Sequence, residues 1–221
     1  GGDVVFCGRA QRYRVGLWAY TSSKYPVTGG IDWSWRTTEH GQATSIHPSI
    51  QIHPHPRLQL EFLPGYSRSS GSVRWIDTRQ TAGGERFLFA DQHAEYWDVT
   101  FRGTFTFTTE LTLQAYAQLF MASVDHTTKY GFVPPGSEIH VGDLMVANDV
   151  GDDYDFTSAN LNLSVVLRWE YLPGSIAYLV YTGAFGDARD RPEFRFDRVL
   201  DTLVESRARH VLMLKISYFW G

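Results

Sequence analysis

The sequence predicts an all-β fold: an antiparallel, up-and-down transmembrane β-barrel of about ten strands, with short turns at one end and long loops at the other. Three observations predict it. Apolar and polar residues alternate with a period of two, aromatic residues make up 15% of the chain, and most glycines and prolines lie between apolar runs. Because 221 residues fit one all-β domain, residues 1–221 are expected to form a single β-barrel domain, or the C-terminal part of a larger barrel protein.

Composition excludes several classes of protein. A net charge of −4 argues against nucleic acid as a partner, since binding phosphates requires positive charge. Cys7 is the single cysteine, so neither an internal disulfide nor a cysteine zinc cluster can form. No run of about 18 apolar residues occurs, which excludes a transmembrane helix but not a barrel, whose strands are apolar on one face only. The first residues contain neither Met nor a signal peptide, and we interpret the chain as mature or truncated.

Four strands are predicted in the N-terminal part of the chain. A first strand is expected near residues 13–21. The alternation then covers residues 31–36, 46–53 and, after the turn HPHPR, 58–62. This pattern places Asp32 and Arg36 on the polar side of one strand and Glu61 on the polar side of another.

The clearest pattern lies in the middle of the chain. Residues 99–107, VTFRGTFTF, place Phe105 and Phe107 on one face and Arg102 on the other. After the short turn TTE the alternation resumes in residues 111–121, LTLQAYAQLFM. Two such runs separated by a tight turn predict a β-hairpin.

Three further strands are predicted toward the C-terminus, at residues 161–171, 176–185 and 210–220. In the first, Trp169 and Tyr171 oppose Arg168 and Glu170. The turn LPGS leads to the second, which is apolar on both faces, and the last strand carries Lys215 on its polar face. A short helix within a loop is expected at residues 199–210.

The connections are asymmetric. The turns HPHPR, TTE and LPGS are short, whereas residues 124–157 and 186–209 are long segments rich in Asp, Gly, Pro and Arg. If the strands run up and down, the short turns share one end of the sheet and the long loops the other. This arrangement is typical of outer-membrane barrels.

Alternation alone does not distinguish a soluble barrel, apolar inside, from a membrane barrel, apolar outside. Opposed charges in the middle of the strands favour the membrane barrel and predict a charged lumen, lined by Asp32, Arg36, Glu61, Arg102, Arg168, Glu170 and Lys215. Aromatic residues beside the short turns and at the last strand's end predict an interfacial girdle of Phe105, Phe107, Trp169, Tyr171, Tyr218 and Trp220.

No metal, cofactor or catalytic site is predicted. His47 and His53 lie about 20 Å apart along an extended strand, so they cannot bind one ion. The motif G-x-S-x-G is absent, and the chain is not expected to be an enzyme. One weak calcium candidate is an acidic loop, for which a solvated loop is the simpler interpretation; it contains Asp149, Asp152, Asp153 and Asp155.

Several runs resemble a known family: FRGTFTFTTELTLQAYAQLFMAS, DFTSANLNLSVVLRWEYLPGSIAYLVYT, HVLMLKISYFW and SIHPSIQIHPHPRLQLEFLPGYSRS. They resemble the C-terminal outer-membrane β-barrel domain of a bacterial family of unknown function, whose members commonly carry an N-terminal domain similar to family nine carbohydrate-binding modules. LRWEYLPGS and LTLQAYAQ are the most specific segments. The resemblance covers about residues 43–220 and implies an outer-membrane location and an association with glycan handling; the first forty residues fit it poorly.

The expected function is therefore that of a bacterial outer-membrane barrel acting as a membrane anchor or narrow conduit, in contact with lipid and lipopolysaccharide. A lumen plugged by buried ion pairs is at least as strongly expected as an open pore, because a small barrel leaves little room beyond its own side chains. One alternative is a soluble barrel or sandwich that binds a glycan or lipid. Another is a subunit that contributes strands to a larger outer-membrane assembly, which an odd strand count would indicate.

Overall fold

The computed structural model describes residues 5–7, 13–37, 41–132, 138–151, 153–189, 203, 206 and 208–220. Ten strands form its main sheet: β2 (Arg14–Tyr20), β3 (Val27–Thr37), β4 (Gln42–His55), β5 (Leu58–Thr81), β6 (Gly84–Thr106), β7 (Leu111–Phe132), β9 (Met145–Val146), β10 (Phe156–Leu172), β11 (Ser175–Arg189) and β12 (Arg209–Ser217). Outside this sheet lie β1 (Val5–Cys7), β8 (Glu138–His140) and a short 3-10 turn, η1 (Val141–Asp143).

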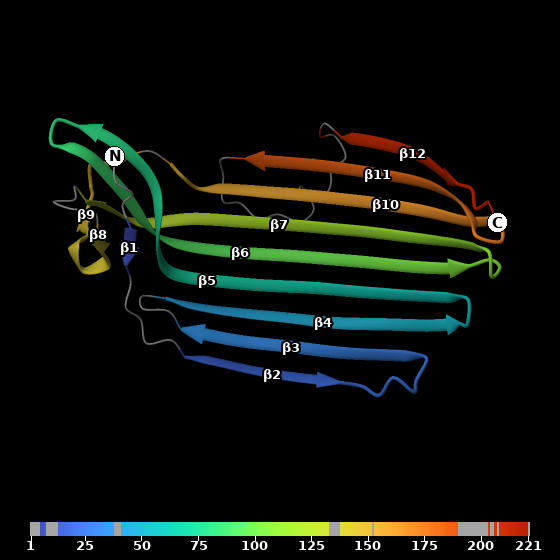
Figure 1. Ribbon diagram of the computed structural model, residues 1–221. Coiled ribbons are helices and arrows are strands. Elements are labelled where there is room, and N and C mark those ends of the chain that lie inside the picture. Colours follow the sequence, from blue (N-terminus) through green and yellow to red (C-terminus); the bar gives the residue numbers. More distant parts are fainter. Residues whose placement is uncertain are drawn as a thin grey trace.

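The sheet is an antiparallel meander in which strands adjacent along the chain lie side by side (Figure 1). The order is β12-β11-β10-β7-β6-β5-β4-β3-β2, with β9 attached to β7. β1 and β8 form a separate parallel pair. The all-β, antiparallel prediction is confirmed. The sheet is not shown closed into a barrel, because no pairing joins β2 to β12 among the described strands.

Several strands are longer than predicted. β5 and β6 form a long hairpin that projects beyond the other strands, at the left in Figure 1. The alternation disappears there because Leu88, Phe89 and Ala90 are all at most 2% exposed, so consecutive side chains are covered on both faces. β7 likewise continues to Phe132, and the loop expected from residue 124 starts only after it.

Most of the helix expected at residues 199–210 lies outside the described residues, and Leu203, which is described, is helical. The predicted C-terminal end of this helix is wrong, because Arg209 and His210 are the first residues of β12. They pair with Ala184 and Gly183 of β11. The helical period is misleading here because a short amphipathic pattern cannot outweigh the pairing available beside an existing strand.

The ends of the sheet differ. One end, at the right in Figure 1, carries the connections 21–26, 56–57, 107–110 and 173–174, which include all three turns singled out in the sequence. The other end carries the long connections 133–155 and 190–208, together with the projecting β5–β6 hairpin and the short link 38–41. The sheet therefore has a short-turn end and a long-connection end.

The ladder gives the sheet two chemically different faces. On β6, Val99, Phe101 and Phe105 lie directly opposite Leu119, Ala117 and Leu113 of β7, on what we call the apolar face. The intervening residues form the polar face, where Thr100, Arg102 and Thr104 lie opposite Gln118, Tyr116 and Gln114. Successive strand residues point to opposite faces, so this division extends across the ladder.

Both faces are largely exposed. The accessible surface is 14775 Å². A compact monomer of this mass would expose about 10,300 Å². In the described residues the buried clusters are small, one around Met121 and Leu203 and one around Leu88 and Val150. The sheet therefore does not bury its own apolar face.

No helix in the described part of the chain is long and apolar enough to cross a membrane.

Candidate functional site

All seven charged residues predicted to line a lumen project from the polar face. Asp32 lies opposite His47, and Arg36 lies opposite Arg14. Farther across the sheet lie the direct pair of Glu61 and Arg102 and, near the short-turn end, Arg168, Glu170 and Lys215, with Tyr178 between Arg168 and Lys215. The strand register thus gathers on one face charges that are distant in sequence. That this face borders a lumen stays a prediction.

Glu61 is at the centre of a polar contact network on this face. It accepts a hydrogen bond of 2.8 Å from the Gln51 side chain and pairs with Arg102 at 3.2 Å. The Arg102 guanidinium also lies 5.8 Å from the centre of the Tyr116 ring. Glu61 has a side chain only 17% exposed, whereas that of Arg102 is 57% exposed, so one end of the pair faces solvent.

Arg168 and Glu170 form a second ion pair at 3.0 Å, beside the β10–β11 turn. The other Glu170 oxygen accepts a hydrogen bond of 3.1 Å from the backbone N–H of Gly174, which has a φ of +79°. Glu170 therefore fixes the turn as well as neutralising Arg168, and glycine is the residue that this turn conformation favours. This supports a structural role for both charges.

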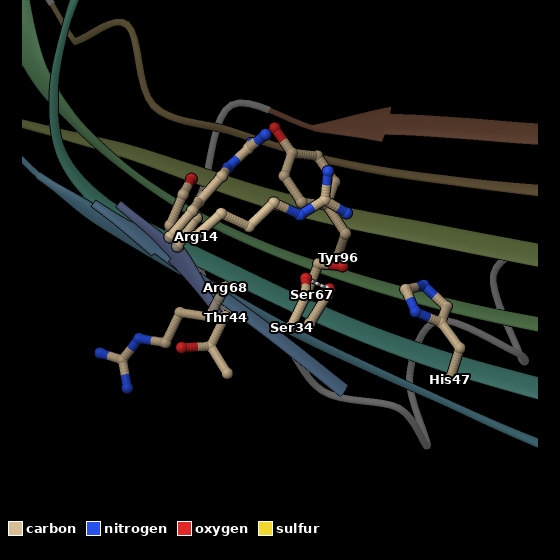
Figure 2. Close-up of a pocket in the computed structure, with 11 residues that line it drawn as sticks. Arg14, Ser34, Thr44, His47, Ser67, Arg68 and Tyr96 are labelled. Atoms are coloured by element: carbon tan, nitrogen blue, oxygen red, sulfur yellow. Dashed lines mark hydrogen bonds between the residues drawn. The ribbon is translucent and has the colours of Figure 1, made fainter. Parts of the chain in front are cut away.

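The polar face has a hollow of about 350 Å³ near the long-connection end, spanning β2 to β6. Arg14 of β2, Arg36 of β3 and Tyr96 of β6 are among the residues that line it. Figure 2 shows Arg14, Tyr96 and Ser67 extending to the same side of the sheet, whereas Arg68 and Thr44 point away from them. We call this feature the arginine hollow.

The six aromatic residues predicted as a girdle gather at the short-turn end. Phe105 and Phe107 pack edge to face at 4.6 Å just before the β6–β7 turn. Trp169 and Tyr171 lie 5.9 Å apart before the β10–β11 turn, and Tyr218 and Trp220 lie 6.2 Å apart after β12. Three chain segments thus bring aromatic rings to one end of the sheet.

Toward the long-connection end, the apolar face is bounded by a row of polar side chains. There Arg68 of β5 pairs with Glu95 of β6 at 3.3 Å, and the next opposite residue is Ser123 of β7. Between this row and the short-turn end, β6 presents apolar or small side chains from Trp97 to Phe107. The apolar face is therefore a band with polar limits.

One corner of the apolar face is covered. Leu203 is fully buried against Leu119, Met121 and Ala159, which belong to this face on β7 and β10. The rest of the band remains open: Phe101 is 39% exposed and Leu214 64%.

The acidic loop is held by an ion pair and by a backbone hydrogen bond. Asp149 accepts hydrogen bonds from Arg86, one of them 2.9 Å long, and these contacts lower its pKa to about 2. Asp155 accepts a 2.6 Å hydrogen bond from the backbone N–H of His126, and Asp152 lies outside the described residues. Across the described ranges, no three His, Cys, Asp or Glu residues are grouped as a metal site would require.

Two residues of the arginine hollow, Arg14 and Tyr96, were not predicted from the sequence. Arg14 lies in the first strand, whose pattern is too irregular to assign its faces, and its position opposite Arg36 depends on register. Tyr96 reaches the arginine hollow from β6, in the region where the alternation is lost. Neither position has a local sequence signal, because long-range pairing brings them together.

Nearly the whole chain, residues 4–220, matches the model of a family described as "Domain of unknown function (DUF5916)". The match begins well before residue 43, so the first forty residues fit the family better than expected. No curated protein and no solved structure matches the chain.

Proposed function

The chain belongs to the DUF5916 family, and from its faces and edges we propose that it forms part of the wall of a bacterial outer-membrane β-barrel. In this proposal the apolar face contacts lipid and lipopolysaccharide, and the polar face borders the lumen. The chain acts as an anchor or conduit rather than as an enzyme. The association with glycan handling and with a family nine-like carbohydrate-binding domain, which the resemblance implies, stays a prediction.

The observation that carries the proposal is an extended sheet with one apolar and one polar face and little self-burial. The chain as a whole exposes about 4,500 Å² more surface than a compact monomer of its mass would. A hydrocarbon environment removes the cost of exposing the apolar face, and only closed barrels of strands satisfy their backbone groups there.

The dimensions of the apolar band support a membrane-spanning role. The ten residue steps from Trp97 to Phe107 extend about 33 Å at 3.3 Å per residue. At a strand tilt of about 40° this spans about 25 Å, the height of the lipid-facing band in outer-membrane barrels. The aromatic residues at the short-turn end then lie at one membrane interface.

The edges of the sheet indicate that further strands complete the wall. Nine strands form the continuous path, so β2 and β12 run in the same direction (Figure 1). Direct closure would pair them in parallel, and so would a second copy in the same membrane orientation. Antiparallel closure requires an odd number of additional strands. We therefore favour the strand-contributing alternative, and a wider barrel favours a conduit over a plug.

A second candidate function has one observation in its favour. Because Leu203 covers Met121 on the apolar face, this face takes part in protein packing at that corner. A soluble sheet that binds a lipid or glycan on the remaining apolar surface would share this feature.

Membrane fractionation tests the proposal against this candidate. The chain is expressed with a signal peptide, and its outer-membrane fraction is washed with alkaline carbonate before detergent extraction. We expect the chain to resist the wash and to migrate differently on SDS gels before and after boiling. Recovery as a detergent-free, soluble monomer would reject the membrane proposal.

A further inference from the structure

Two arginines lie side by side on the polar face, and no counter-charge pairs with them in the described part of the chain. Arg14 of β2 is directly opposite Arg36 of β3, where opposite Cβ atoms are about 5 Å apart and like charges repel. Neither guanidinium has a hydrogen-bond or ion-pair partner among the residues that the structure describes. Two further arginines on this face, Arg102 and Arg168, are each paired with a glutamate. Arg14 and Arg36 differ from that pair of arginines because they lie directly opposite each other, and a bound anion would relieve their repulsion.

The neighbouring residues leave room for such an anion. The row next to the arginines consists of Gly16, Ser34, Ser45 and Ser67, all small, and ends at Tyr96. The Ser34 and Ser45 hydroxyls are 2.8 Å apart, so one donates to the other and the second keeps its hydrogen for another acceptor. The hollow above this row measures about 350 Å³.

We propose that the arginine hollow binds the oxyanion group, a carboxylate or phosphate, of a hydroxylated solute. Arg14 and Arg36 supply the charged contacts, because guanidinium groups present paired donors that match such oxyanions. The serine hydroxyls and the Tyr96 ring contact the remainder of the solute.

Carboxylates in the next row limit where the anion binds. Asp32 accepts a hydrogen bond from Tyr20, and Asp98 occupies the space above Gly65, where an added Cβ would lie 2.3 Å from an Asp98 oxygen. His47 lies between these two acids along the row. Negative charge here keeps an anion at the arginine side of the hollow.

Equilibrium binding in detergent tests the site without requiring a pore. The full chain is titrated by calorimetry with inorganic phosphate, galacturonate and neutral galactose. We expect phosphate or galacturonate to bind and galactose not to bind; whichever anion binds more tightly identifies the oxyanion. Arg14→Gln and Arg36→Gln should each weaken binding about tenfold or more, as expected for loss of a charge-assisted contact.

Arg74→Gln is the matched control, since Arg74 is exposed on the projecting hairpin and its loss removes the same charge. This variant should bind as the unchanged chain does. Arg14→Lys and Arg36→Lys keep the charge but lose the paired donors, so intermediate affinity is expected even if a glutamine variant does not fold. Equal binding of galactose, no binding by the folded chain, or equal losses in Arg74→Gln would overturn the inference. Conductance across a planar bilayer tests the proposed function separately, since binding in detergent does not depend on it.

Discussion

At the residue scale, the two glutamates of the polar face, Glu61 and Glu170, are each matched by a neighbouring arginine. Glu61 contacts both Arg102 and Gln51, and Glu170 contacts Arg168 and the following turn. Because these groups are partly exposed, solvent screening keeps each ion pair weak. Their main effect is to fix side-chain positions on a face that carries both signs of charge.

A double-mutant cycle measures the Glu61–Arg102 pair. Glu61→Gln and Arg102→Gln are each expected to lower the free energy of unfolding, with a coupling of about 0.5–1 kcal/mol. Urea unfolding of the two single variants and the double variant gives this value. A coupling near zero would mean that the contact contributes nothing to stability.

The pairing of Asp149 with Arg86 predicts a pH dependence. The pKa of Asp149 is lowered from 3.8 to about 2 by the hydrogen bond and charge of Arg86. A lowered pKa means that the ionised form is favoured in the folded chain, so this contribution is complete above about pH 4 and is lost as the pH falls toward 2. The melting temperature should therefore fall less steeply across this window for Asp149→Asn than for the unchanged chain. Identical slopes would contradict the pairing.

At the element scale, the sequence predicted the strands where only one face is apolar and failed elsewhere. The hairpin of residues 99–121 was found because its period-two pattern is regular. The β5–β6 extension was missed because Leu88, Phe89 and Ala90 are all buried. Alternation places the seven charged residues on one face, as the register does, but their role in a lumen and the aromatic girdle stay predictions. The arginine hollow depends on register between distant strands.

Adjacent residues of β10 test the assignment of the faces. Val165 lies on the apolar face and Ser164 on the polar face, both near the middle of the strand. In lipid vesicles, Val165→Arg should lower the free energy of unfolding by about 2–4 kcal/mol, because it places a charge near the bilayer midplane. Ser164→Arg, the matched control, should change it by less than about 1 kcal/mol. Guanidinium titrations compare the two, and equal effects would contradict the assignment.

At the scale of the whole molecule, the edges of the sheet and its two faces both lead to the expectation that further strands pair with β2 and β12. Within the described residues, no strand pairs with the outer edge of β2 or of β12, and much of the apolar surface is uncovered. Neither edge is stable in lipid unless it is paired. A barrel built from this sheet therefore needs additional strands beside β2 and β12, antiparallel to both.

Lipid contact at the apolar face can be measured directly by fluorescence quenching. In a Cys7→Ser background, Phe101→Cys and Arg102→Cys each receive an environment-sensitive fluorophore, and the protein is reconstituted into vesicles containing brominated lipid. Because these neighbours on β6 point to opposite faces, we expect strong quenching at position 101 and little at position 102. Equal quenching at both positions, or stronger quenching at position 102, would contradict the account.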